Sequence, residues 1–475
     1  MARATTTFVC SSCGNESAKW FGKCPECGEW NTFREFILPQ NQKSKTRNQN
    51  SEIEFKSLGK ISIDPIKRIS TDIKEFDRVL GGPSTSSGLQ GIVPGSVILI
   101  SGDPGIGKST LMLQLALNLS KSKDTDKESR IKNQESGRKK GLITKDQRPK
   151  TKLNVLYVSG EESEPQISHR AQRIASNKVL SDSTIKVISS TNIDQVFHAV
   201  SREKIDLIIL DSVQTIGSDE VAGFPGSLPQ IRYVGMKVSH YAKKNNIPIF
   251  MVGHVTKEGI VAGPQLLSHM VDVVLYLEGE SLTGTRIIRA FKNRYGDTSE
   301  VGIFVMDEKG LSEITEVENF FIDTKKSAVG SCITVVQEGS RPILVEIQAL
   351  AIKSNLSFPR RVATGISEKR LEMLLAVLQK HGRLNTYEFD IFVNVVGGLK
   401  IAETASDLAV IASIASSIKG KPMLKTVAVG EVGLLGEVKS VLQLERRIKE
   451  ANKFGFKNIY SVKNVTNILE LVKNI

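Results

Sequence analysis

The sequence predicts an α/β domain, and three observations support that prediction. Between residues 59 and about 315, short apolar runs alternate with helical patterns, which is typical of strands connected by helices. A glycine-rich loop separates an apolar strand at 97–100 from a helical segment at 111–117. A cysteine cluster precedes this region, and a second α+β pattern follows it from about 325 to 475. We therefore expect a large α/β domain with a further domain on each side.

Length and composition indicate a multidomain globular protein. The 475 residues, 40% of them hydrophobic, suffice for roughly two to four domains with real cores. No stretch is long and apolar enough to span a bilayer, and residues 1–7 lack the apolar region of a secretory signal. We expect a cytoplasmic protein without membrane contacts.

The net charge of +13 suggests an anionic partner such as nucleic acid. However, residues 121–152 hold 12 Lys/Arg and 5 Asp/Glu, so 12 − 5 = 7 of that excess lies in one segment. This polar segment interrupts the α/β domain and predicts a disordered basic insertion, with a DNA-binding arm as the alternative. Residues 37–58, rich in Gln, Asn, Lys and Ser, predict a linker. The expected domains are thus 1–36, 59–318 and 325–475.

Four of the five cysteines lie in the first 27 residues, as two Cys-x-x-Cys pairs ten residues apart: Cys10, Cys13, Cys24 and Cys27. This spacing is typical of a zinc finger in which four thiolates surround one Zn²⁺. Two disulfides are the alternative, which the expected cytoplasmic setting disfavours. Four protein ligands leave no open position, so we expect a structural metal.

The aromatic residues of this small domain allow two interpretations. We expect Trp20, Phe21 and Trp30 to form its core. An exposed face that stacks on nucleic-acid bases is the alternative. The fifth cysteine, Cys332, is expected in a core.

The glycine-rich loop fits G-x-x-x-x-G-K-[ST] and lies between a strand and a helix, as a phosphate-binding loop requires. Its backbone N–H groups would surround the phosphates, and Lys108 would reach the β- and γ-phosphates. The Ser109 hydroxyl would ligate Mg²⁺, so we expect Mg²⁺ with ATP or GTP. The loop consists of Gly102, Asp103, Pro104, Gly105, Ile106, Gly107, Lys108, Ser109 and Thr110.

Two further strands end in acidic residues that suit hydrolysis. The run 206–211 ends in Asp211, which fits the Walker B pattern and would orient Mg²⁺. The run 155–159 leads to Glu161 and Glu162, and either could be the general base that activates water. A solvated pair of loop acids is the alternative.

Three polar side chains follow later strands. His254 comes after the apolar run 249–253, where a strand tip would face the γ-phosphate; an ordinary strand-end histidine is the alternative. Lys292 and Arg294 follow the strand at 286–291, and their spacing places them on one side. They could contact the γ-phosphate of a neighbouring subunit, but on the residues alone a solvated basic strand end is favoured.

Several motifs together resemble the bacterial RadA (Sms) family of recombination and repair proteins. They are KCPECGEWNT at 23–32, the phosphate loop at 102–110, SGEES at 159–163, KNRYG at 292–296 and EGSRP at 338–342. Tyr295 stands where the family has Phe, which keeps an aromatic ring. The resemblance covers nearly the whole chain except 37–58 and 121–152.

The resemblance implies a RecA-type ATPase core, with Glu161 as the catalytic glutamate. It also implies that Lys292 and Arg294 act across subunits, as in ring helicases, and hence a ring, expected to be a homo-hexamer. The implied partners are single-stranded and branched DNA and a RecA-type recombinase.

The C-terminal unit resembles the Lon protease domain, whose catalysis needs a Ser–Lys dyad. Matching 403–409 to the nucleophile segment puts Ala405 at the Ser position, and matching 430–451 puts Glu445 at the Lys position. Ser406, one residue further, would be rotated by roughly 100° on a helix. We therefore expect a scaffold for ring assembly and DNA rather than a protease.

The expected function is a DNA-dependent ATPase of homologous recombination and repair that drives branch migration as a helicase-like ring. A nucleotide-switched assembly factor without motor activity is the alternative.

Overall fold

The computed structural model describes part of the chain. The chain consists of two compact units, each with most of its contacts between its own residues. The first unit comprises Met1–Ile73, Leu80–Tyr276 and Phe291–Gly296, and the second Lys74–Val79, Leu277–Ala290 and Asp297–Ile475. Apart from the end residues Ile37, Lys121 and Lys152, the expected linker at 37–58 and the expected insertion at 121–152 lie outside the described residues. The described residues are 6–10, 16–17, 19–26, 28–37, 67–81, 90–121, 152–253, 262–279, 284–314, 322 and 328–475.

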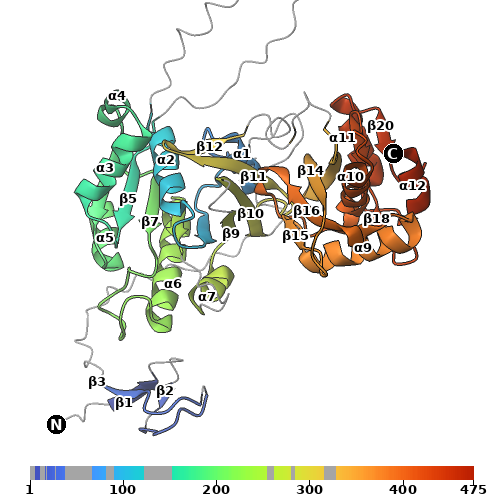
Figure 1. Ribbon diagram of the computed structural model, residues 1–475. Helices are drawn as coiled ribbons and strands as arrows, with labels where there is room; N and C mark the ends of the chain where they lie inside the picture. The colour runs from blue at the N-terminus through green and yellow to red at the C-terminus, as the bar shows by residue number, and fades with distance from the viewer. Residues whose placement is uncertain are drawn as a thin grey trace, which may run out of the picture. The chain divides into compact units, whose positions relative to one another are not determined.

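Nine strands of the described chain form one sheet in the order β12-β11-β10-β9-β4-β8-β7-β5-β6 (Figure 1). Its parallel part, β4-β8-β7-β5-β6, belongs to the first unit, and β10, β11 and β12 pair antiparallel. All eight strands expected between 97 and 305 are confirmed. The bounds are β4 Val97–Gly102, β5 Val155–Ser159, β6 Ile185–Ser189, β7 Leu207–Asp211, β8 Ile249–Val252, β9 Val273–Gly279, β10 Thr285–Asn293, β11 Val301–Asp307 and β12 Gly310–Glu313.

Four of the five parallel strands are fully buried because helices cover them, whereas the edge strand β6 is not. Every residue of β4, β5, β7 and β8 is buried, so these strands read as continuous apolar runs rather than alternating ones. Apolar side chains of α5, α6 and α7 form one core cluster with β4, β5, β7 and β8, and α2 packs on β4, β5 and β6. The helices are α2 Lys108–Ser120, α3 Glu164–Ile174, α4 Asn177–Ser181, α5 Ile193–Val200, α6 Leu228–Asn245 and α7 Ala262–Met270.

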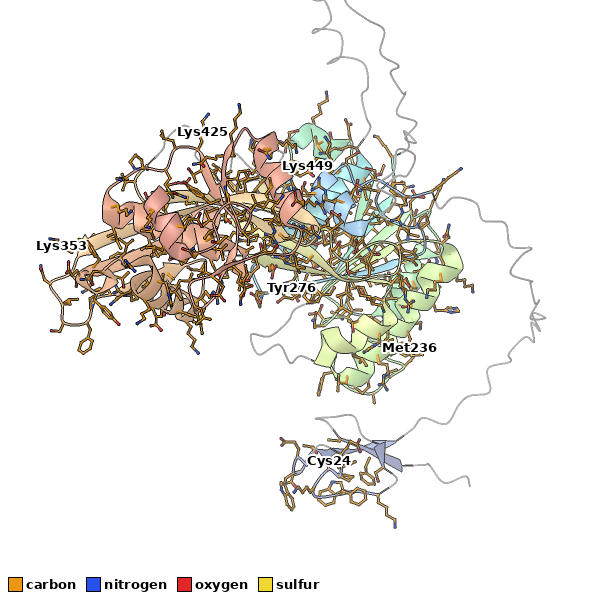
Figure 2. The ribbon with its side chains drawn as sticks, turned by 90° about the vertical axis from the view of Figure 1, so that its right-hand side faces the viewer. Cys24, Met236, Tyr276, Lys353, Lys425 and Lys449 are labelled. Carbon is orange, nitrogen blue, oxygen red and sulfur yellow. The ribbon has the colours of Figure 1, made fainter. Side chains whose placement is uncertain are left out.

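The N-terminal ribbon contains β1 Thr6–Cys10, β2 Glu16–Ser17 and β3 Phe33–Ile37, paired antiparallel in the order β2-β1-β3. Cys10, Cys24 and Phe33 form its buried cluster; Figure 2 labels Cys24.

The expected aromatic core of the ribbon is wrong. Trp20 is 54% exposed and Trp30 68%, while Phe21 is 43% exposed and its ring meets that of Phe33 in an edge-type arrangement. Among the described residues of this short ribbon, the buried positions belong to Cys10, Cys24 and Phe33, with Phe8 partly buried against them, and the two indoles lie outside this cluster.

The second unit contains an α+β domain. Its six-stranded sheet has the order β15-β16-β14-β13-β17-β20, and the strands expected at 343–348 and 389–395 lie in β14 and β16. The strands are β13 Ser331–Glu338, β14 Arg341–Lys353, β15 Arg361–Thr364, β16 Phe389–Val395, β17 Thr426–Ala428, β18 Glu431–Val432, β19 Val438–Lys439 and β20 Asn458–Tyr460.

Helices cover this second sheet. The helix expected at 370–379 lies in α9, whereas the one expected at 404–418 starts as a short 3-10 turn, η4, before α10. All residues from Asp407 to Ser416 of α10 are buried, so this helix is the centre of the domain. The helices of this domain are α9 Glu368–Gly382, η2 Thr386–Glu388, η3 Val396–Gly398, η4 Thr404–Ser406, α10 Asp407–Lys419, α11 Leu444–Lys453 and α12 Ile468–Asn474. A further helix, α1 Lys74–Leu80, precedes β4 in the chain.

Within the described part of the chain, no helix has the length and apolar character needed to cross a membrane.

Candidate nucleotide-binding and hydrolysis site

The phosphate-binding loop has the backbone conformation that its glycines permit. It connects the end of β4 at Gly102 to the first residue of α2, Lys108. Gly102, Gly105 and Gly107 have φ values of 150°, 75° and 110°, a region that other residues rarely adopt. A Cβ on Gly105 would meet no atom within 4 Å, so this position requires glycine for its conformation and not for space.

Lys108 is buried against its own loop. Its side chain is 3% exposed, and Nζ donates to the carbonyl oxygens of Gly102 and Asp103, both at 2.8 Å. Burial lowers the pKa of Lys108 to about 8, while Asp211, Asp103 and Glu161 raise it. The two acids assigned to hydrolysis from sequence therefore lie within electrostatic reach of this lysine.

Asp211 ends β7 and is held by a tyrosine from the neighbouring strand. β5 and β7 pair in parallel, and the hydroxyl of Tyr157 donates to Asp211 Oδ2 at 2.5 Å. Burial raises the pKa of Tyr157 well above its usual value, and the adjacent Asp211 raises it further. The phenol therefore stays protonated and acts as a fixed donor to a carboxylate that is only 7% exposed.

The two acids that follow β5 have different partners, which the sequence does not reveal. Glu161 Oε1 accepts a hydrogen bond of 2.5 Å from the Ser212 hydroxyl, beside Asp211. Glu162 forms an ion pair with Arg170 of α3. Glu161 thus faces the end of β7, whereas the Glu162 carboxylate is paired with α3.

Lys292 and Arg294 lie together at the end of β10. Nζ of Lys292 donates to the carbonyl oxygens of Ser268 and Val271, at 2.7 and 2.8 Å, where the C-terminus of α7 favours a cation. Arg294 is half exposed, and Nη1 lies 3.0 Å from Oδ1 of the buried Asp272. Burial lowers the pKa of Lys292, and Arg294 lowers it further.

This cation pair is at the opposite end of β4 from the phosphate loop. Asp272 accepts from the backbone N–H of Val97, the first residue of β4, and its own N–H donates to the Val97 carbonyl. Gly102 is five residues further along β4, or about 17 Å at about 3.3 Å per residue. Lys292 and Arg294 are therefore remote from the phosphates that the same chain would bind.

The turn that carries Arg294 packs closely on another part of the first unit. A Cβ on Gly296 would lie 2.9 Å from Gly81 Cα, and Asn293 Nδ2 donates to the Leu80 carbonyl at 3.0 Å. Arg68 donates to the carbonyls of Tyr295 and Gly81, at 2.5 and 2.7 Å. These contacts fix the position of the cation pair.

Sequence reasoning missed five residues of these sites. All five are polar: four touch a predicted site residue, and Arg68 touches the turn that carries Arg294. In sequence they lie within an apolar run, directly after a motif, or on an unrelated element. A polar residue inside or beside a buried strand was the available signal. They are Arg68, Tyr157, Arg170, Ser212 and Asp272.

Not all predicted site residues belong to the described chain. His254 lies outside it, as do Cys13 and Cys27. Cys10 and Cys24 are 2% and 1% exposed, as thiolate ligands enclosed by a ribbon would be. Gly28, with φ 74°, donates its N–H to the Cys24 carbonyl at 3.0 Å, which makes the tight turn that a zinc knuckle requires.

In the second unit, the residues matched to a peptidase dyad lie as follows. Ala405 is 2% exposed and belongs to a core cluster. Ser406 is 3% exposed, and its hydroxyl donates to the Glu403 carbonyl at 3.4 Å. Glu445 is largely exposed and pairs with Lys463 at 2.5 Å.

Models of known protein families match two parts of the chain, the N-terminal ribbon and the domain that contains the phosphate loop. The model of a rubredoxin metal binding domain matches residues 8–35, and that of an AAA domain matches residues 64–259. Among solved structures, the RadB recombinase aligns with 52% of this chain and 99% of its own, at 18% identity and with a TM-score of 0.34.

Curated relatives match over nearly the full length. The DNA repair protein RadA of Pseudomonas aeruginosa is 41% identical over 461 residues, 96% of this chain and 92% of its own. That of Bacillus subtilis is 42% identical over 465 residues, 97% and 93% respectively. That of Campylobacter jejuni is 39% identical over 464 residues, 96% and 94%. With its zinc ribbon and its AAA-type ATPase domain, the chain belongs to the family of the DNA repair protein RadA.

Proposed function

We propose that this protein is a DNA-dependent ATPase of homologous recombination and DNA repair, and that it drives branch migration as a ring-shaped motor. The observation that carries this proposal is the separation of the phosphate loop from the cation pair Lys292 and Arg294 along β4. Cations that cannot reach the phosphates of their own chain suit an arginine finger inserted from a neighbour. A repeated head-to-tail contact of this kind generates a ring, for which a hexamer is our expectation.

Each subunit interface would then hold one complete hydrolysis site. One chain would supply the phosphate loop, Lys108 for the phosphates and Glu161 as the general base for the attacking water. The next chain would supply Arg294 and Lys292, which would stabilise the charge that develops on the γ-phosphate. Ser109 and Asp211 would hold Mg²⁺, which when bound with ATP neutralises phosphate charge.

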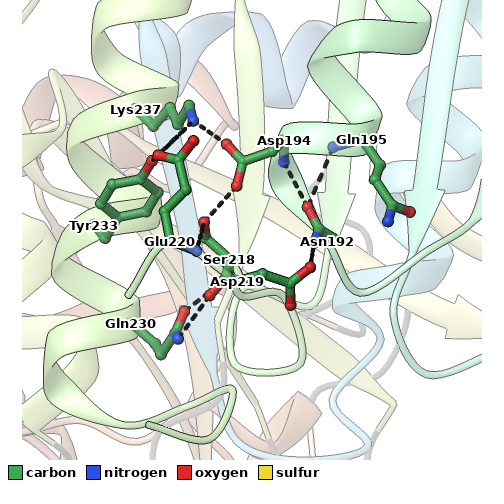
Figure 3. A network of polar contacts seen from close by, with 9 residues as sticks. All are labelled: Asn192, Asp194, Gln195, Ser218, Asp219, Glu220, Gln230, Tyr233 and Lys237. Atoms are coloured by element: carbon green, nitrogen blue, oxygen red, sulfur yellow. Dashed lines mark hydrogen bonds and ion pairs between the residues drawn. The ribbon is translucent and has the colours of Figure 1, made fainter. Parts of the chain in front are cut away.

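DNA contact is proposed for the loop between β7 and α6. Figure 3 shows that this loop is tied to α5 and α6: Asn192 donates to Asp219, and Tyr233 to Glu220. The buried Gln230 accepts from the Ser218 N–H at 2.8 Å and donates to the Ser218 carbonyl at 3.0 Å. Because its acidic residues are occupied in this way, the exposed Arg232 of α6 can meet a DNA phosphate.

The proposal includes a second DNA contact, a structural metal and a protein partner. Lys257, a further proposed DNA contact, lies outside the described residues. Contacts to phosphates predict binding that weakens steeply with salt and depends little on sequence. The four cysteines Cys10, Cys13, Cys24 and Cys27 would hold one structural Zn²⁺, and a RecA-type recombinase is the proposed protein partner.

The proposal is tested by heteroduplex extension on a synthetic three-strand branched DNA with ATP. Wild type should extend the heteroduplex, whereas Lys108→Ala and Arg294→Ala should not. Wild-type protein that binds DNA and hydrolyses ATP but gives no extension, with or without a recombinase, would contradict the motor and favour a nucleotide-switched assembly factor.

A further inference from the structure

Ser212 connects the hydrolysis site to the loop proposed to bind DNA. It is fully buried, its hydroxyl donates to Glu161, and it is the first residue after β7. We propose that Ser212 is a positioning residue that fixes the Glu161 carboxylate and couples it to the loop 213–227, so that DNA bound there controls ATP hydrolysis. This inference rests on the proposed function and names a route of regulation within the same site.

The first step is the bond itself. A serine hydroxyl can donate one hydrogen bond. Ser212 Oγ donates it to Glu161 Oε1, at a distance of 2.5 Å. Hydrogen bonds to an ionised acceptor are stronger than neutral ones. A general base must lie within hydrogen-bond reach of the proton it removes, so a bond that restricts the Glu161 side chain bears directly on the rate.

The second step is the close fit between the end of β5 and the turn after Ser212. The Gly160 N–H donates to the Asp211 carbonyl at 2.9 Å. A Cβ on Gly160 would lie 2.2 Å from Thr215 Oγ1, which itself donates to the Ser212 carbonyl at 2.9 Å. With no free space between them, a displacement of this turn must move Ser212 relative to Glu161.

The third step leads from the turn to the loop. Gly217, two residues after Thr215, donates to the Thr191 carbonyl at 2.7 Å and accepts from the Ile193 N–H at 2.9 Å. The next residue, Ser218, bonds to Gln230 and to Asp194 (Figure 3). A displacement of the loop at Ser218 can therefore be transmitted to Ser212 along the five intervening backbone residues, 213–217.

The experiment compares Ser212→Ala with Ser413→Ala in the full-length protein. Ser413 is also fully buried, but its hydroxyl donates to the Val410 carbonyl inside α10. For Ser212→Ala we expect kcat to fall about 10- to 100-fold, as for loss of a bond to a charged group. KM and the Kd for an ATP analogue should stay within about threefold of wild type, and stimulation by single-stranded DNA should largely disappear. Ser413→Ala should match wild type in all four quantities.

A double variant separates an effect through Glu161 from a general structural effect. Glu161→Gln and Glu161→Gln/Ser212→Ala should hydrolyse ATP at the same single-turnover rate within about threefold, because the serine would act only through the carboxylate. A further tenfold fall in the double variant, or loss of analogue binding in Ser212→Ala, would show a structural role and overturn the proposal.

The remaining outcomes separate this inference from the proposed function. Normal kcat and DNA stimulation in Ser212→Ala would overturn the inference while the motor stands. Wild-type ATPase activity that DNA does not change would instead contradict the proposed function.

Discussion

The two ends of β4 carry cations in opposite situations. At its C-terminal end, Lys108 is 3% exposed and bonded to two carbonyls of its own loop. At its N-terminal end, Arg294 remains half exposed although it pairs with the buried Asp272. One cation is thus enclosed by its own chain, and the other presents about half of its surface to the outside.

This difference is the one that the proposed action of Arg294 across subunits requires. An enclosed lysine within electrostatic reach of Asp211 and Glu161 suits a ligand held by its own loop. An exposed guanidinium fixed in position by the close packing of Gly296 against Gly81 suits a ligand that another molecule brings.

The largest effect should come from losing either cation, with recovery on mixing. Lys108→Ala and Arg294→Ala should each lower the ATPase rate about 1,000-fold or more. Equal amounts of the two variants, dissociated and reassembled together, should recover up to about a quarter of wild-type activity. Half of the phosphate loops would belong to Arg294→Ala subunits and so keep Lys108. Half of these loops would face a Lys108→Ala subunit, which keeps Arg294, so a quarter of the sites would be complete.

The control for mixing is a variant with both changes in one chain. Reassembly of Lys108→Ala/Arg294→Ala with Lys108→Ala should recover nothing, because no chain in the mixture has an intact loop. If Lys108→Ala and Arg294→Ala fail to complement although size-exclusion chromatography shows mixed oligomers, action across subunits is refuted.

The second prediction concerns the loop end alone. Glu161→Gln should lower kcat about 100- to 1,000-fold, because the amide cannot accept the proton of water. Glu162→Gln, a matched change one residue away, should lower it less than about threefold, since that carboxylate pairs with Arg170 of α3. Steady-state ATPase assays decide the matter, and a larger effect at position 162 would reverse the assignment.

How far the sequence predicts this structure depends on how local each feature is. The phosphate loop and the buried parallel strands follow from adjacent residues, and the structure confirms them. The roles of Tyr157 and Asp272 depend instead on which strands are neighbours. Tyr157 meets Asp211 only because β5 lies beside β7, and Asp272 meets Arg294 only after β9 and β10 have formed. A single chain without covariation carries no direct signal for such pairings.

The ribbon shows a second reason for a failed prediction. Trp20 and Trp30 were expected inside because large aromatic residues usually supply cores. In this small domain Cys10 and Cys24 are buried, and the indoles remain on the surface. Hydrophobicity alone does not predict which side chains are buried when the positions of metal-binding cysteines determine which residues face inward.

The third prediction uses the burial of Lys108. Because its pKa is lowered to about 8, the free protein loses this charge as the pH rises through that value. Bound phosphates favour the charged form, so binding above pH 8 takes up a proton, and affinity should fall by up to about tenfold per pH unit. Fluorescence titration of an ATP analogue between pH 7 and 9.5 measures this slope. Lys108→Arg keeps its charge throughout and should show a nearly flat profile, and an equally flat wild-type profile would refute the prediction.

The smallest predicted effect concerns the tyrosine that holds Asp211. Tyr157→Phe removes one hydroxyl from a buried position and leaves the ring, so the fold should persist with a loss of about 1 kcal/mol. Without the 2.5 Å bond to Oδ2, the carboxylate is less well oriented, and half-maximal ATPase activity should need roughly tenfold more Mg²⁺.

Tyr276→Phe is the matched control, since Tyr276 lies in β9 and its ring meets Phe291 rather than Asp211. Mg²⁺ titrations at saturating ATP compare the two variants with wild type. An unchanged Mg²⁺ requirement in Tyr157→Phe would mean that the backbone of β7 alone orients Asp211. The enclosed end of β4 would then need no support from β5, and the contrast between its two ends would rest on Lys108 and Arg294 alone.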